Sequence, residues 1–148
     1  MKIAVASDHA GRRLKDSVRD HLRTLGHEVQ DLGPDQDGRV DYPDFGARGA
    51  RMVAAGQVDR AVLVCGSGIG MSMTANRFRG VRAVVAALET QARLARAHND
   101  ANVLCLGERL TAETLALVIT EAFMDAEFEG GRHEARVAKI DDVGDSSG

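Results

Sequence analysis

The residues with the clearest chemical potential lie in VLVCGSGIGMS, residues 62–72. An apolar run ends at Cys65, and three glycines follow within the next five residues. Glycines let a backbone approach a ligand closely and direct successive N–H groups towards it. A helix that begins directly afterwards adds positive potential. Such a loop suits a phosphate, an enolate or a thiolate, and the alternative is a tight turn that needs glycine for geometry alone.

The glycine spacing departs from three known loop templates. Residues 66–70 read G-x-G-x-G, whereas a dinucleotide-binding loop reads G-x-G-x-x-G and follows the first strand. No Gly-Lys-Ser/Thr follows, as a P-loop would require. Met71 stands where a cysteine phosphatase would carry an arginine. These absences argue against all three classes.

Cys65 is expected where a strand meets a helix, a position that favours the reactive thiolate. A buried structural cysteine is the alternative. Cys105 fits that alternative, since leucines flank it on both sides in NVLCLG. With only two cysteines, both in apolar surroundings, free thiols in a reducing cytoplasm are expected.

Two further polar pairs lie at the ends of predicted elements. Asp8 and His9 follow the first apolar run, where they could bind a ligand or cap the next helix. His98 and Asn99 lie between a helix end and a strand. His98 could act as a general acid or base near neutral pH, or it could simply complement the helix dipole.

Basic residues gather late in the chain, at Arg109, Arg132, His133 and Arg136. Arg132 and Arg136 are four apart, so on a helix they share one face. Two guanidinium groups on one face suit a phosphate, although a solvated basic patch is the alternative. Since HEAR lacks the second histidine of a zinc-binding HExxH, no metal site is expected.

Composition limits the class of protein. The chain has 148 residues, 44% of them apolar and 28% charged, with a net charge of −3. The size and the apolar fraction suit one globular domain. Negative charge argues against a nucleic-acid partner, and no apolar run is long enough to span a membrane. We expect a single domain over residues 1–140 and a flexible tail over 141–148.

Short apolar runs alternate with amphipathic stretches along the chain. The runs predict strands at 2–6, 27–32, 60–65, 81–87 and 102–107. Helices are predicted at 10–25, 43–56, 69–78, 89–98, 111–124 and 133–142. Most runs do not alternate polar with apolar residues, which is typical of parallel strands buried on both faces. The pattern therefore predicts an α/β fold with ligands bound beyond the strand ends.

Seven segments in order resemble the ribose/galactose isomerase family, and the resemblance spans residues 1–140. They are SDHAG, DYPDFG, CGSGIG, ANRF, GVRAVV, ARAHNDANVLCLGER and EGGRHEARV. The resemblance implies a Rossmann-like three-layer α/β/α sandwich with a five-stranded parallel sheet. It also implies cofactor-free and metal-free interconversion of ribose 5-phosphate and ribulose 5-phosphate. The unit would be a homodimer, or a tetramer, with active sites built from both subunits.

The resemblance also implies a role for each matching residue. Cys65 falls on the catalytic base, Ser67 on a hydroxyl that assists proton transfer, and His98 on the group that opens the sugar ring. The other matching positions would contact the sugar (Asp8, Tyr42 and Asn99) or the phosphate (His9, Arg109, Arg132 and Arg136). Apart from the resemblance, we expect the backbone N–H groups of the glycine loop to face the reacting oxygens (Gly66, Gly68, Ile69 and Gly70). One branch of the family uses a glutamate further along instead of the cysteine, but MSMTANRF contains no carboxylate.

Two alternatives to a ribose 5-phosphate isomerase stay open. The first is an isomerase of a six-carbon sugar phosphate, such as allose or galactose 6-phosphate, in the same family. The second is a non-catalytic module that binds a sugar phosphate or a nucleotide on the same fold. The presence together of Cys65, Ser67 and His98 argues against a simple binder, since binding alone needs no thiolate.

Overall fold

The apolar runs form a five-stranded, all-parallel sheet in the order β2-β1-β3-β5-β4. The computed structural model describes residues 1–143. The strands are β1 (Lys2–Ser7), β2 (Glu28–Asp31), β3 (Arg60–Cys65), β4 (Ala83–Val85) and β5 (Val103–Gly107). All five predicted strands are confirmed. The central strands β1, β3 and β5 are apolar because both faces are covered, whereas the edge strand β2 (EVQD) is partly exposed.

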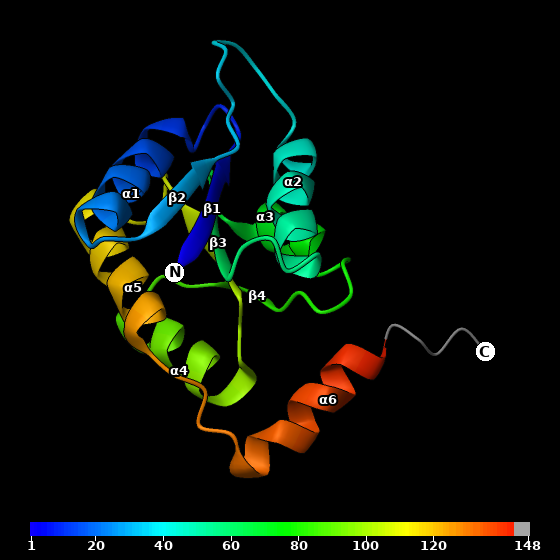
Figure 1. Cartoon of the computed structure of the whole chain (residues 1–148). Coiled ribbons are helices and arrows are strands. Elements are labelled where there is room, and N and C mark those ends of the chain that lie inside the picture. Colours follow the sequence, from blue (N-terminus) through cyan, green and yellow to red (C-terminus); the bar gives the residue numbers. More distant parts are fainter. Residues whose placement is uncertain (144–148) are drawn as a thin grey trace.

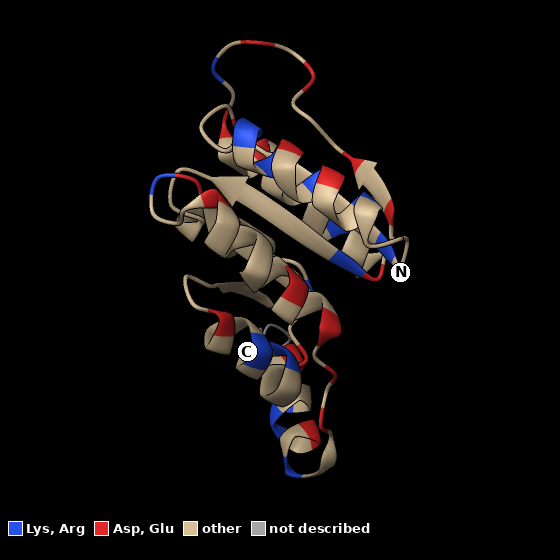
Figure 2. Cartoon of the chain, turned by 90° about the vertical axis from the view of Figure 1, so that its left-hand side faces the viewer, with Lys and Arg blue, Asp and Glu red and all other residues tan. Residues whose placement is uncertain are grey.

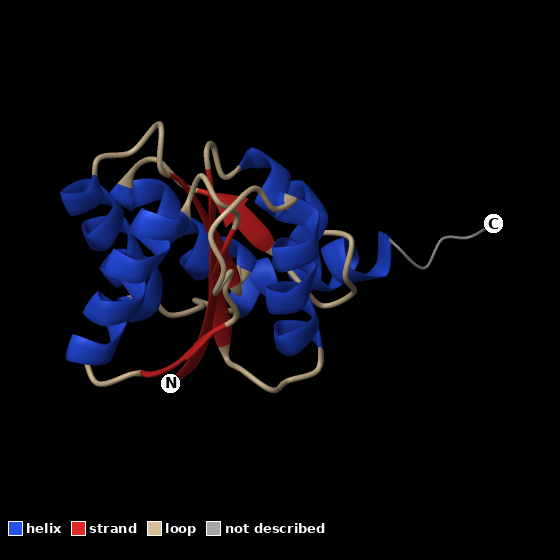
Figure 3. Ribbon diagram, turned by 90° about the horizontal axis from the view of Figure 1, so that it is seen from above, coloured by secondary structure: helices blue, strands red, loops and turns tan. Residues whose placement is uncertain are grey.

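Helices cover both faces of this sheet, as Figure 3 shows from above. They are α1 (Arg12–Thr24), α2 (Tyr42–Ala54), α3 (Ile69–Ala75), α4 (Glu89–Asn99), α5 (Glu113–Asp125) and α6 (Glu134–Asp142), with a short 3-10 helix η1 (Gly131–His133) before α6. In Figure 1, α1, α4 and α5 lie on one face and α2 and α3 on the other. The predicted Rossmann-like three-layer α/β/α sandwich is confirmed.

Alternate strand residues pack into two separate cores. Ile3 and Val5 of β1 face the core beneath α1, α4 and α5. Ala4 and Ala6 face the core beneath α2 and α3. All four are fully buried, which explains why β1 shows no polar alternation in the sequence.

The strand register brings the predicted site residues together. Ser7 of β1 pairs with Val64, and Cys65 of β3 pairs with Gly107. The chain passes from β1 outwards to β2 and then returns to β3, so the strand order reverses between β1 and β3. Such a reversal opens a crevice at the carboxyl ends of the two strands. The residues that follow β1 and β3 therefore face a common space.

Helix α6 extends away from the sandwich, at the end of the molecule opposite the β1 and β3 carboxyl ends (Figure 1). Arg82 attaches it to the body through a two-pronged ion pair with Asp141, at 2.9 and 3.0 Å. The same guanidinium also pairs with Asp100 at the end of α4, at 3.2 Å. Of the expected tail, Asp141 and Asp142 belong to α6, and residues 144–148 lie outside the described residues.

Charged residues of both signs are interspersed along the helices, as Figure 2 shows for α1 and its surroundings. On α1, for example, Arg19 pairs with Asp16 and Asp20 of its own helix at 2.9 and 2.8 Å. In the part of the chain that the structure describes, no helix combines the length and apolar character needed to cross a membrane.

Candidate active site

A pocket of about 550 Å³ opens at the carboxyl ends of β1 and β3. It is lined by Asp8, His9, Ala10, Tyr42, Cys65, Gly66, Ser67, Ile69, Gly70, Met73, Arg109 and Leu110. Nine of these twelve residues were singled out from the sequence. A cavity of about 580 Å³ along α2 is lined mainly by charged and apolar residues, with neither a thiol nor a hydroxyl group. The pocket at the ends of β1 and β3, which contains Cys65 and Ser67, is therefore the candidate active site.

Cys65 ends β3 and presents its sulfur to the glycine loop. The backbone N–H of Gly68 donates a hydrogen bond to Sγ over 3.1 Å. Gly68 has a φ of +76°, a left-handed conformation that favours glycine. A hydrogen bond donated to sulfur favours the thiolate over the thiol. The loop thus positions a donor on the atom that needs negative charge.

Cys105 lies in the neighbouring strand β5 and does not line the pocket. It is fully buried among apolar side chains, and this burial raises the pKa of its thiol far above the ordinary value. Cys105 is therefore inert at neutral pH. Cys65 is also buried, with 5% of its surface exposed, and it belongs to the same core cluster as Cys105, but of the two cysteines only Cys65 lines the pocket.

The glycines of the loop also make room for two side chains of the pocket. A Cβ atom at Gly66 would lie 3.3 Å from the guanidinium of Arg109, and one at Gly70 would lie 2.5 Å from the Tyr42 ring. The loop is tied to the β5–α5 connection, since Arg109 N–H donates to the Gly66 carbonyl at 3.0 Å. Its glycines therefore let Arg109 and Tyr42 pack directly against the backbone beside Cys65.

The loop after β1 contributes Asp8 and His9. Asp8 is 6% exposed, and its Oδ1 accepts a hydrogen bond from the Gly11 N–H at 3.0 Å, directly before α1. The alternative predicted for Asp8, the N-cap of the next helix, is wrong, because Gly11 is the N-cap of α1 and no side chain caps that helix. Asp8 binds the N–H of this N-cap residue and lines the pocket. His9 is exposed, with Nδ1 at 3.2 Å from the Val40 N–H. When Nδ1 accepts that N–H, Nε2 carries the proton and can donate to a phosphate.

Ser67 lies between Cys65 and α3. Its hydroxyl oxygen accepts a hydrogen bond from the Ile69 N–H at 3.3 Å. The Gly68 N–H likewise donates to the Cys65 sulfur. The N–H groups of Gly68 and Ile69, which were expected to face the reacting oxygens, thus donate to side chains of the loop instead. The N–H groups of Gly66 and Gly70 are the ones left to consider for a substrate oxygen.

Five predicted site residues do not line this pocket within one chain. One is Gly68, which belongs to the glycine loop itself, and the other four are His98, Asn99, Arg132 and Arg136. Helix α4 crosses back from the end of β4 to the start of β5, so His98 and Asn99 at its end lie at the opposite edge of the sheet. Arg132 on η1 and Arg136 on α6 are exposed. One chain thus divides the predicted residues between two ends of the molecule.

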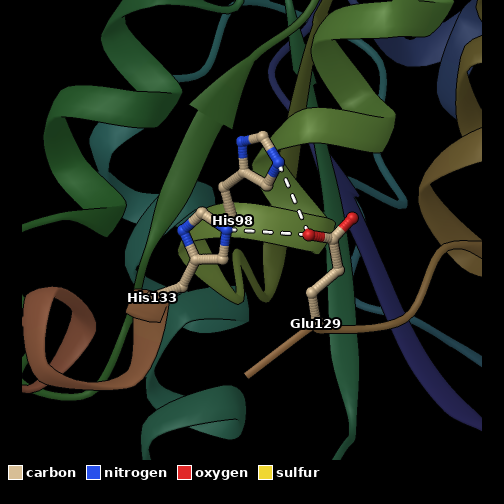
Figure 4. Close-up of side chains that lie close together, drawn as sticks. All are labelled: His98, Glu129 and His133. Carbon is tan, nitrogen blue, oxygen red and sulfur yellow. Dashed lines mark ion pairs between the residues drawn. The ribbon is translucent and has the colours of Figure 1, made fainter. Parts of the chain in front are cut away.

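The second group includes a cluster that the sequence did not predict. His98 and His133 stack with ring centroids 4.3 Å apart, and Glu129 Oε2 lies 3.8 and 3.6 Å from their Nε2 atoms (Figure 4). Burial, with the nearby His98 ring and Arg132, lowers the pKa of His133. Glu129 and His133 are four residues apart, which is the one signal in the sequence that could have indicated this pair.

Comparison with known proteins identifies the family of the chain. The family model described as Ribose/Galactose Isomerase matches residues 3–140. Ribose-5-phosphate isomerase B of Escherichia coli is 45% identical over 139 residues, 94% of this chain and 93% of that protein. A structure of ribose-5-phosphate isomerase B from Clostridium thermocellum is 45% identical and superimposes with a TM-score of 0.97 over 100% of both chains.

A further solved structure includes a sugar phosphate. Ribose-5-phosphate isomerase B from Mycoplasma genitalium, with bound ribulose 5-phosphate, is 41% identical to this chain and superimposes with a TM-score of 0.94. The match covers 99% of this chain and 97% of that one. On the family model and on these relatives, the chain belongs to the ribose/galactose isomerase family.

Proposed function

We propose that this chain interconverts ribose 5-phosphate and ribulose 5-phosphate, with Cys65 as the base. The observation that carries the proposal is the hydrogen bond from Gly68 to the Cys65 sulfur, at the mouth of a pocket lined by polar and cationic groups. A ligand-binding module has no need of a thiolate held in this way. The relatives named ribose-5-phosphate isomerase B, one of them with ribulose 5-phosphate bound, support the same substrate class.

The reaction moves one proton between neighbouring carbons. The Cys65 thiolate removes the proton from C2 of the open-chain aldose, and the electron pair forms a cis-enediolate with negative charge on the oxygen of C1. The resulting thiol returns the proton to C1, which yields the ketose. Ser67 moves a proton between the oxygens of C1 and C2. The complete cycle returns Cys65 to the thiolate and Ser67 to the neutral hydroxyl.

The developing charge on oxygen needs donors that exist before the reaction. The Gly66 and Gly70 N–H groups belong to the loop beside Cys65, and a preorganised donor of this kind contributes roughly 3 kcal/mol to transition-state stabilisation. Asp8 and Tyr42, on the pocket wall, would hold the sugar hydroxyls. His9 and Arg109 would bind the phosphate, since both can donate to anionic oxygens.

A second copy of the chain would complete the pocket. His98, Asn99, Arg132 and Arg136 lie away from Cys65 in their own chain, so we assign them to the pocket of a partner in a homodimer, or in a tetramer built from such dimers. Exposed apolar side chains at the pocket rim support this arrangement, because Ile69, Met73 and Leu110 are 49%, 67% and 68% exposed. His98 of the partner would then assist ring opening of the cyclic sugar phosphate.

An isomerase assay with the Cys65→Ala variant tests the proposal. We expect the wild-type chain to convert ribose 5-phosphate and the variant to lose nearly all turnover while it keeps its fold by circular dichroism. The Cys105→Ala variant is the matched control and should retain kcat. Turnover by Cys65→Ala near the wild-type rate would exclude the base. Binding of ribose 5-phosphate without turnover by the wild type would indicate a binding module, and a higher kcat/KM for allose 6-phosphate would indicate a six-carbon isomerase.

A further inference from the structure

The His98, Glu129 and His133 side chains bring three metal-ligating atoms into one small space. These atoms all lie within 4.8 Å of one another, although the residues come from the end of α4, the loop after α5, and η1 (Figure 4). The two rings stack at an interplanar angle of 13°. Figure 4 shows both Nε2 atoms directed at the same carboxylate oxygen of Glu129.

His133 provides an independent sign that this cluster lacks a ligand. The residue is 6% exposed, and its buried Nε2 has no hydrogen-bond partner among the described residues. The Glu129 oxygen at 3.6 Å is too distant for a hydrogen bond. Buried polar atoms are almost always satisfied, so an unpartnered one that points into a cluster of ligating atoms requires an explanation.

The donor set matches a particular class of cation. Two imidazole nitrogens and one carboxylate oxygen form a common zinc-binding set, with a fourth position left open. Bonds of about 2.0–2.2 Å to a tetrahedral ion place ligand atoms about 3.3–3.6 Å apart. Glu129 Oε2 already lies 3.6 and 3.8 Å from the two Nε2 atoms. The three ligand atoms lie within 4.8 Å of one another, and the two stacked rings would have to rotate out of their stack to direct both Nε2 lone pairs at one ion.

We propose that His98, Glu129 and His133 form a binding site for a divalent transition-metal ion, with Zn²⁺ as the best match. The ion enters from the solvent side, where the Glu129 side chain is 60% exposed. Arg132 and Arg136 act on the same cluster and oppose a dication. The site is therefore weaker than a closed structural zinc site and binds the ion reversibly.

Occupation of the site has a consequence for activity, which rests on the proposed function. An ion on Nε2 of His98 removes the group assigned to ring opening and adds positive charge beside the arginines assigned to phosphate. Zn²⁺ should therefore inhibit an isomerase that needs no metal, and ribose 5-phosphate should compete with it. The isomerase reaction itself still proceeds without any metal.

Calorimetric titration of the full chain with ZnCl₂, after treatment with EDTA, tests the site directly. We expect saturable binding of one Zn²⁺ per chain. In histidine-edited NMR spectra, the ring signals of His98 and His133 should shift, while those of the other three histidines stay in place. Glu129→Gln and His133→Ala should each weaken binding at least about tenfold. Glu129 is exposed, so its variant should fold even if His133→Ala does not.

Two controls separate this site from other zinc ligands in the chain. His21 and Glu121 form a His–Glu pair at 2.6 Å elsewhere on the surface, so His21→Ala should leave Zn²⁺ affinity unchanged. Cys65→Ala should also retain binding. The proposal is overturned if no saturable binding occurs, if Glu129→Gln binds as tightly as the wild type, or if Cys65→Ala abolishes binding.

Binding and activity have separate readouts. Zinc shifts of His98 and His133 in a chain that does not isomerise ribose 5-phosphate would support the metal site and refute the proposed function. An active isomerase in which neither ring signal shifts on addition of Zn²⁺ would support the proposed function and refute the metal site.

Discussion

The Gly68 backbone N–H donates a hydrogen bond of 3.1 Å to the sulfur of Cys65, three residues earlier in the chain. The bond exists because Gly68 adopts a left-handed φ of +76°, which turns the loop back on the end of β3. A donor stabilises a sulfur anion more than a neutral thiol, so the loop places its N–H where the proposed base needs it.

Gly68→Ala keeps the N–H group but strains the loop, so we expect the N–H to move away from the Cys65 sulfur and kcat to fall by about two orders of magnitude, as it does when a well-placed donor is lost. An alanine at this φ is strained by roughly 1–2 kcal/mol, and its Cβ would meet the Leu106 carbonyl carbon at 3.1 Å. Steady-state kinetics with ribose 5-phosphate measures the effect. Gly80→Ala is the matched control, since Gly80 has a φ of +75° and open space around it. The idea fails if both variants keep wild-type kcat.

Alkylation should distinguish the two cysteines. Iodoacetamide near neutral pH should modify Cys65 and abolish activity in parallel, because the Gly68 N–H supports its thiolate at the edge of a pocket. Cys105 should react only after unfolding, since burial raises the pKa of its thiol and excludes the reagent. Peptide mass spectrometry at several reaction times checks the order. Modification of Cys105 in the folded chain would contradict it.

Mixing two inactive variants tests the shared pocket. Cys65→Ala lacks the base and His98→Ala lacks the ring-opening group, so neither homodimer should be active. Random exchange of subunits should form heterodimers in which one pocket is intact, and activity should recover to about a quarter of the wild-type value. The assay is isomerisation after mixing and incubation. No recovery, with heterodimers demonstrated by native mass spectrometry, would show that each pocket takes both residues from one and the same chain.

Asp31 should control stability in acid. Burial alone would raise the pKa of Asp31, but hydrogen bonds from Lys15, the Gly33 N–H and Arg19 outweigh burial and hold this pKa below its usual value. A carboxyl whose pKa is depressed by folding stabilises the fold above its unfolded pKa of about 3.9, and this stability is lost as pH falls through the folded pKa.

Asp31→Asn should therefore lower the free energy of unfolding by roughly 2 kcal/mol at neutral pH. It should also flatten the decline in stability below about pH 4. Urea unfolding at a series of pH values provides the comparison. Asp37→Asn is the control, because Asp37 pairs with Arg12 on the open surface. An unchanged acid profile in Asp31→Asn would show that other groups control the decline.

Much of the fold and about two thirds of the site could be predicted from the sequence. The strands were visible because a residue such as Val62 is buried whichever face it occupies, which leaves an unbroken apolar run. Asp8, Cys65 and Arg109 could be grouped because each follows a strand, and parallel strands end at one edge of the sheet.

The same topology also determines the position of His98. A helix that returns from the end of one parallel strand must finish at the opposite edge, so His98 at the end of α4 could not join Cys65 in its own chain. The contact of His98 with Glu129 and His133 was beyond reach of sequence patterns. It depends on where the chain travels after α5, which long-range contacts such as the Arg82–Asp141 pair determine.

The ion pairs of Arg82 with Asp100 and Asp141 have an energetic consequence for the association of two chains. One guanidinium binds both Asp100, beside His98, and Asp141, near the end of α6, so two segments distant in sequence move as one body. Groups that are already immobile lose little conformational entropy when they meet a partner. Each chain would therefore offer His98 and the exposed arginines to its neighbour as a preorganised unit, and the free energy of assembly would not be consumed in ordering them.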